Sequence, residues 1–183
     1  MRSAAPVTLA ALERWAVALR ELIAGRTVAH PETNAPVRLT YAEPGARVPL
    51  YVAVSSPKIH RLAGKIADGA IVLVGTDRQF LEGSRRELEA GAAEAGRDLK
   101  ATGFRVVCWT PCSIQDDGQA ARRAVKAHVS RVLKRKLPFE LDAATMEVAR
   151  KVKENYEYYQ HMVVGTAHGE EAIRAARRDR ACR

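Results

Sequence analysis

The stretch VPLYVAVSSPKIHRLAGKIADGAIVLVGT, residues 48–76, contains two apolar runs on either side of an amphipathic segment. Both runs, PLYVAVS and AIVLVGT, are rich in residues that favour β-strands. Between them, Ser56 and Pro57 fit the N-cap and the first position of an α-helix that ends at ADG. The helix is expected to bury Ile59, Leu62, Ala63 and Ile66. This order predicts a βαβ unit with two buried parallel strands.

Further elements are predicted on both sides of this unit. A first helix is expected over residues 8–24 and a short strand over residues 37–41. A helix from Asp77 aligns Leu81, Ser84, Leu88 and Ala92 on one face. GFRVVCWTPCS reads as a third strand, DDGQAARRAVKAHVSRVLKRK as a fourth helix, and a last helix runs from Asp142 to Val163. The alternation predicts an α/β fold with about three parallel strands flanked by helices.

Composition and charge narrow the class of protein. The chain has 183 residues and a formal net charge of +9, but the ending RAARRDRACR holds five of the arginines against one aspartate. Elsewhere lysines and arginines alternate with acids on helices, which is typical of solvated faces rather than of a nucleic-acid surface. No apolar run approaches the roughly 20 residues of a membrane span, and the first helix is too charged for a signal peptide. We therefore expect a cytoplasmic protein.

The cysteines and the helical histidine have unremarkable interpretations. Cys108 and Cys112 lie four residues apart near a strand, about 13 Å if extended, which is too far for a disulfide. With Cys182 they form no disulfide framework, and no zinc-ligand spacing is visible. We expect Cys108 and Cys112 to be small buried residues, and His128 to pack on the apolar face of its helix.

The central stretch is similar to a segment of the luciferase-like monooxygenase superfamily. VPLYVAVSSPKIHRLAGKIADGAIVLVG resembles its strand–loop–helix–strand segment, and the block AGKIADGAI is the most specific part. EAGRDL and SIQDDGQAAR also match, and the resemblance runs over about residues 5–171. It looks closest to the deazaflavin-dependent branch that includes methylenetetrahydromethanopterin reductase.

The resemblance implies a TIM (β/α)8 barrel, of which this chain would be part. The strands at Pro49, Ala70 and Gly103 look like strands five, six and seven of the barrel. A whole barrel takes about 250 residues. The chain is therefore expected to be a truncated, C-terminal part of a family enzyme. Residues 1–173 would form a single partial-barrel domain, and residues 174–183 a basic, disordered tail.

The turn after the first central strand is the first candidate site. Ser55 and Ser56 offer hydroxyls, Lys58 offers a positive charge, and the N–H groups of Lys58 and Ile59 are expected to be free at a helix N-terminus that favours anions. Family members bind a flavin or deazaflavin at the carboxyl ends of their strands, so the resemblance implies that these residues hold the cofactor phosphate. The family more often has glycine where this chain has Ser56. The alternative is that Ser56 and Pro57 only begin a helix.

The end of the next strand is the second candidate site. By the same resemblance, Gly75 and Thr76 would line the cofactor site, because glycine permits close approach and a threonine hydroxyl can donate to a phosphate oxygen. The alternative is a glycine at a strand end followed by a helix cap.

The sequence thus predicts a fragment of an oxidoreductase that uses a deazaflavin coenzyme (coenzyme F420) or FMN. Such an enzyme transfers a hydride to, or monooxygenates, a small organic substrate, with the chemistry carried by the ring. No catalytic residue can be named, and no metal site is expected. One alternative is an inactive remnant that acts only through assembly, as a homo-oligomer covering open sheet edges. The other is a basic nucleic-acid-binding module.

Overall fold

The computed structural model describes residues 7–133 and 142–154 of the chain. The chain divides into two compact units, within each of which the residues contact one another more than they contact the other unit. The first unit comprises residues 1–73 and 84–107, and the second comprises residues 74–83 and 108–183. The prediction of a single domain over residues 1–173 stays a prediction, and the basic tail at 174–183 lies outside the described residues.

Helix α1, Leu9–Ile23, opens the first unit and confirms the helix predicted over residues 8–24. The hydroxyl of Thr8 accepts a hydrogen bond from the N–H of Ala11 at 3.1 Å, which satisfies one of the donors left open at a helix start. Ala24 is the C-cap of the helix, and Gly25 follows with φ +76°, a left-handed conformation that glycine adopts without strain.

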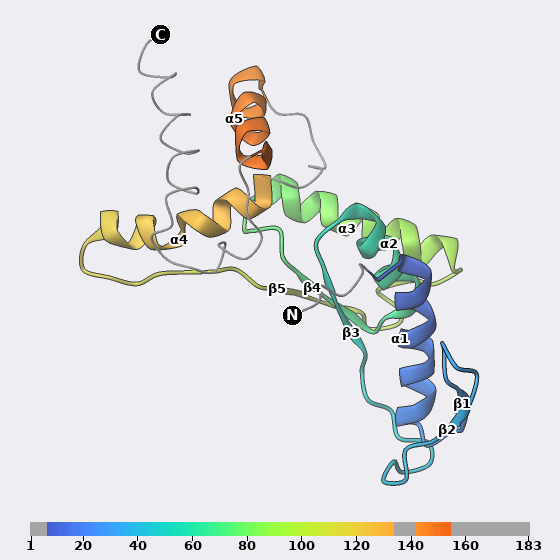
Figure 1. Ribbon diagram of the computed structural model, residues 1–183. Helices are drawn as coiled ribbons and strands as arrows, with labels where there is room; N and C mark the ends of the chain where they lie inside the picture. The colour runs from blue at the N-terminus through green and yellow to red at the C-terminus, as the bar shows by residue number, and fades with distance from the viewer. Residues whose placement is uncertain (1–6, 134–141, 155–183) are drawn as a thin grey trace. The chain divides into compact units, whose positions relative to one another are not determined.

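A two-stranded hairpin lies beside α1 (Figure 1). Strand β1, Val28–Ala29, pairs antiparallel with β2, Pro36–Val37. The strand predicted over residues 37–41 is therefore wrong in extent, because β1 offers only two residues to pair with. The ring of Trp15 on α1 meets the ring of His30 edge-on, with centroids 5.0 Å apart, which joins the hairpin to the helix.

The centre of the first unit is a three-stranded parallel sheet, as the sequence predicts. Its strands are β3, Tyr51–Val54, then β4, Gly69–Val72, and then β5, Arg105–Cys108, whose last residue falls in the second unit. Strands β3 and β4 lie side by side, with Val52 opposite Ala70 and Val54 opposite Val72 (Figure 1). The N–H of Arg105 donates to the carbonyl of Asp68 at 3.2 Å, where β5 joins the sheet.

Helices α2, Pro57–Ile66, and α3, Arg78–Glu94, supply the core. The side chains with less than a tenth of their surface exposed include Val54, Leu62, Ala63, Val72, Ser84, Leu88 and Ala92. The predicted face of α3 is confirmed at Ser84, Leu88 and Ala92. The predicted face of α2 is correct at Leu62 and Ala63 but misses His60, which is buried, whereas Ile59 and Ile66 are only half-buried.

Asp68 ties the amino-terminal edge of the sheet to α1. Its carboxylate accepts hydrogen bonds from the N–H of Leu50 at 2.8 Å and from the guanidinium of Arg20 at 3.1 Å. Arg20 also donates to the carbonyl of Ile66 at 2.8 Å. Burial raises the pKa of the Asp68 carboxyl, but the Leu50 N–H and Arg20 outweigh that effect and hold the pKa below its ordinary value.

The second unit contains helices α4, Gly118–Leu133, and α5, Ala143–Glu154, which contact each other. Asp117 directly precedes α4, and its carboxylate accepts a hydrogen bond from the N–H of Gln119 at 2.8 Å. The expectation that Cys108 and Cys112 are buried is wrong, because both are exposed. Strand β5 is exposed along its whole length, so it gives Cys108 no core to enter.

Some predictions concern residues or side chains that the structure does not describe. The predicted extension of the last helix to Val163 lies outside the described residues, and so does Cys182. The side chain of His128 is not described. Within residues 7–133 and 142–154, no helix is both long and apolar enough to span a membrane. The cytoplasmic location stays a prediction.

Candidate functional site

The first candidate site is the turn between β3 and α2. Ser55 follows the last residue of β3, and Ser56 is the N-cap of α2, with Pro57 at the first helical position as predicted. Because β3 and β4 run parallel, this turn leaves the carboxyl edge of the sheet, the edge at which α/β proteins bind ligands.

Ser56 caps the helix with its backbone instead of its side chain. Its φ of −137° is extended backbone that any residue adopts, so a serine is not strained there. Its hydroxyl makes no capping hydrogen bond; the Ser56 carbonyl instead accepts from the N–H groups of Ile59 and His60, both at 3.0 Å. The expectation that Ile59 offers a free N–H is therefore wrong, because the first turn is tightened onto that carbonyl.

The donors that remain at this turn suit an anion. Among the described residues, none accepts a hydrogen bond from the N–H of Lys58, and neither the Ser55 nor the Ser56 hydroxyl has a partner. The Lys58 side chain is exposed, and both serines are half-buried. Two hydroxyls, one N–H and one ammonium group at a helix N-terminus can together bind the oxygen atoms of a phosphate group.

The second candidate site, Gly75 and Thr76, belongs to the second unit. Gly75 has φ +87°, so glycine is needed there for conformation, and a side chain at this position would meet no neighbour within 4 Å. Thr76 is exposed. The cap of α3 is Asp77, whose carboxylate accepts from the N–H of Gln79 at 2.9 Å. A carboxylate therefore already occupies this helix N-terminus and disfavours a second anion.

The five predicted residues thus divide between the two units: Ser55, Ser56 and Lys58 belong to the first, and Gly75 and Thr76 to the second. Nothing in either unit tests whether they bind a cofactor, so their role stays a prediction. Among the described residues, no three His, Cys, Asp or Glu side chains gather where a metal ion could be held.

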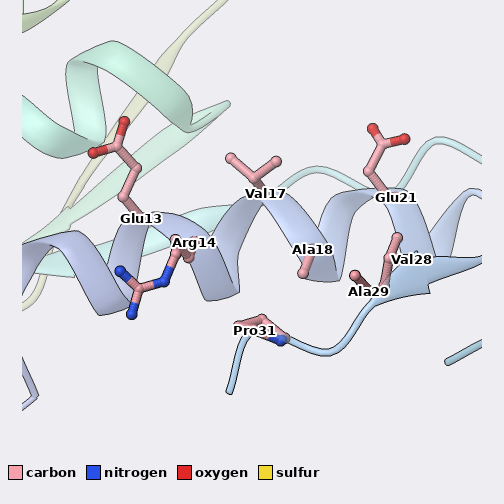
Figure 2. A pocket seen from close by; sticks show the side chains of 8 residues that line it. All are labelled: Glu13, Arg14, Val17, Ala18, Glu21, Val28, Ala29 and Pro31. Atoms are coloured by element: carbon pink, nitrogen blue, oxygen red, sulfur yellow. The ribbon is translucent and has the colours of Figure 1, made fainter. Parts of the chain in front are cut away.

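A separate hollow of about 450 Å³ lies between α1 and the hairpin (Figure 2). It is lined by Glu13, Arg14, Val17, Ala18, Glu21, Val28, Ala29 and Pro31. Its two carboxylates are each engaged elsewhere, Glu13 with Lys65 at 2.7 Å and Glu21 with Arg26. None of the five predicted site residues lines this hollow, whose lining residues all belong to the first unit.

Comparison with known proteins decides the family. The family model described as luciferase-like monooxygenase matches residues 5–180. This chain belongs to the luciferase-like monooxygenase family. The match extends over nearly the whole chain, so the resemblance seen in the central stretch is confirmed.

Relatives of this luciferase-like chain include two kinds of enzyme. It is 30% identical over 88 residues to a 5,10-methylenetetrahydromethanopterin reductase of Archaeoglobus fulgidus, covering 48% of this chain and 25% of the relative. It is 34% identical over 96 residues to an F420-dependent glucose-6-phosphate dehydrogenase of Microbacterium testaceum, covering 51% of this chain and 29% of the relative. The matches thus span between a quarter and a third of these curated relatives.

A solved structure confirms the fold. The coenzyme F420 dependent tetrahydromethanopterin reductase of Methanopyrus kandleri superposes with a TM-score of 0.60 at 21% sequence identity. The likeness covers 94% of this luciferase-like chain and 48% of that chain. The predicted partial barrel of about three parallel strands is therefore confirmed.

The sequence pattern does not reveal the roles of two residues at the candidate sites, His60 and Asp77. His60 reads as a polar residue off the apolar face of α2, yet it is 3% exposed. Its position four residues after Ser56 is the available signal, because that spacing places a ring nitrogen over the capping carbonyl. The sequence predicts only that a helix begins near Asp77. Aspartate is a preferred N-cap residue, and this preference is the signal for its capping role.

Proposed function

We propose that this chain is the part of a flavin- or deazaflavin-dependent oxidoreductase that holds the cofactor phosphate. The observation that carries the proposal is the turn at Ser55–Ser56–Lys58, whose hydroxyls and Lys58 N–H have no partner in the described part of the chain. The turn lies at the carboxyl edge of a parallel sheet, at a helix N-terminus, where phosphate groups bind.

The relatives support this function and indicate its cofactor. One carries F420 dependence in its name, as does the solved structural neighbour, and both are named as oxidoreductases. We therefore expect the deazaflavin coenzyme F420 ahead of FMN, and a small organic molecule as substrate. The comparisons give no support to an inactive remnant or to a nucleic-acid-binding module.

The residues present fit the phosphate of such a cofactor. When bound, the cofactor ring supplies the hydride chemistry. This chain's contribution is binding and orientation: the Ser55 and Ser56 hydroxyls donate to phosphate oxygens, the Lys58 N–H donates along the helix dipole, and the Lys58 ammonium group neutralises charge. At the second candidate site, Gly75 and Thr76, the hydroxyl of Thr76 is a weaker candidate for binding phosphate than those of Ser55 and Ser56. The carboxylate of the neighbouring Asp77 repels an anion there.

Titration of the purified chain with coenzyme F420, and separately with FMN, tests the proposal. Fluorescence and thermal shift are read for the wild type, for Ser55→Ala and for Lys58→Ala. We expect saturable binding of one cofactor and a loss of about tenfold or more in affinity for each variant, as for a hydrogen bond to a charged group.

Lys100→Ala is the matched control, because Lys100 is exposed in the first unit and belongs to the loop after α3. Its affinity should equal that of the wild type. A folded wild type that binds neither cofactor would refute the proposed function. Equal affinity loss in the Lys58 and Lys100 variants would show that only net charge matters and would remove the turn as the site.

A further inference from the structure

His60 is a buried side chain to which the proposed function assigns no role. It lies in the first turn of α2, and only 3% of its surface is exposed. Its ring Nδ1 is 2.7 Å from the carbonyl oxygen of Ser56. Because a carbonyl can only accept, we assign the ring proton to Nδ1, which donates to Ser56.

The Ser56 carbonyl is the only polar atom through which its peptide group can be held. The next residue is Pro57, which has no N–H, so the peptide between them offers no donor. That carbonyl gathers three donors, namely the N–H groups of Ile59 and His60 and the ring nitrogen of His60. The ring hydrogen bond is the shortest of the three, and it comes from a side chain that packing holds in place.

This arrangement determines which groups remain at the turn. In an ordinary serine cap, the hydroxyl accepts from the N–H two or three residues on. Here the N–H of Ile59 is directed to the Ser56 carbonyl, and the Ser56 hydroxyl makes no capping bond. The carbonyl that His60 holds thus replaces the hydroxyl as the cap and leaves the hydroxyl for a ligand.

We propose that His60 is a positioning residue for anion binding at the Ser55–Ser56–Lys58 turn, acting through its Nδ1–H hydrogen bond to the Ser56 carbonyl. The inference rests on the proposed function, since it concerns the same turn. It adds a residue that does not touch the ligand. His60 orients the peptide group between Ser56 and Pro57, and this peptide group lies between the Ser56 hydroxyl and the Lys58 N–H.

Two substitutions separate the hydrogen bond from packing. His60→Leu puts an apolar side chain of similar volume in the same place and removes the donor. His60→Asn keeps an N–H donor at the same distance from the backbone as Nδ1 but leaves a space. The control is His30→Leu, the same change at the hairpin histidine, whose ring instead accepts from the N–H groups of Glu32 and Thr33.

Affinity for coenzyme F420, FMN and inorganic phosphate is measured beside thermal unfolding for each protein. We expect His60→Leu to bind about three- to tenfold more weakly, and His60→Asn to bind within about twofold of the wild type even though it unfolds at a lower temperature. His30→Leu should bind as the wild type does. A purely structural role would make affinity follow stability and place His60→Asn last.

The nitrogen-15 shifts of the His60 ring provide a readout on the wild type that needs no variant. A protonated Nδ1 is expected, and a neutral ring protonated only on Nε2 would overturn the inference. So would equal affinities of His60→Leu and the wild type. If the wild type binds none of the three probes, the proposed function itself fails and the inference falls with it, which distinguishes the two failures.

Discussion

Replacing Gly64 with alanine will destabilise the first unit, because helices α2 and α3 meet there backbone to backbone. A Cβ on Gly64 would lie 2.9 Å from the carbonyl carbon of Leu88, 3.1 Å from the nitrogen of Ala92, and closer still to the Leu88 oxygen. Gly91 makes the reciprocal contact, since its Cβ would lie 2.5 Å from both the Cα and the carbonyl carbon of Arg61.

The magnitude follows from two opposing effects. Overpacking a close-packed contact costs about 1–3 kcal/mol, and backbone atoms cannot rotate aside as a flexible side chain can. Alanine favours a helix interior over glycine by about 1 kcal/mol, which offsets part of this cost. Because the three nearest atoms that the new Cβ would meet all belong to the backbone, we take the upper end of the overpacking cost, about 3 kcal/mol, and subtract the gain of about 1 kcal/mol. We therefore expect Gly64→Ala to lose about 2 kcal/mol of unfolding free energy, which corresponds to a fall of about 4–8 °C in Tm for a chain of this size.

Urea denaturation and calorimetry of Gly64→Ala provide the assay, with Gly118→Ala as the matched control. At Gly118, the first residue of α4, a new Cβ would meet nothing nearer than the side chain of Arg122 at 3.9 Å. The control should be neutral or slightly stabilised. A Gly64→Ala protein as stable as the wild type would show that the two helices do not approach this closely, and the reasoning would be refuted.

Two further predictions concern Asp68 and the exposed cysteines. Asp68→Ala should lower the unfolding free energy by about 2 kcal/mol, measured by urea denaturation, because it leaves the Leu50 N–H and Arg20 without their acceptor. Since the folded pKa of Asp68 is lowered, its stabilisation is complete above the ordinary value of 3.8 and is lost as the pH falls through the folded pKa. The acid limb of stability against pH should therefore be shallower in Asp68→Asn, and an unchanged limb would contradict this. Cys108 and Cys112 should both label with a thiol reagent in the folded protein, as read by mass spectrometry, and protection of either would contradict their exposure.

The sequence predicts those parts of the fold that depend on local periodicity. The strand–helix–strand order around residues 48–76 and the buried face of α3 follow from apolar spacing, and the structure confirms both. The start of α2 at Pro57 follows from the chemistry of its cap.

What the sequence could not predict depends on partners distant in the chain or on geometry within one turn. From the sequence alone, Gly64 is an unfavourable residue in a helix interior. The reason for it is the close contact with α3, which the sequence does not show. The exposure of Cys108 follows from the position of β5, which an apolar run does not reveal. At the candidate site, the residue types of Ser55, Ser56 and Lys58 predict an anion-binding turn. They do not predict that the carbonyl of Ser56, instead of its hydroxyl, caps the helix.

Mapping bound cofactor onto backbone amides by nuclear magnetic resonance tests the central claim most directly. Coenzyme F420, FMN and inorganic phosphate are titrated separately into the nitrogen-15-labelled chain. The account predicts saturable shifts centred on the amides of Ser55, Ser56 and Lys58, shared by phosphate and the bound cofactor. Shifts confined to the hollow beside α1, at Arg14 and Val17 (Figure 2), or no shifts at all, would contradict it.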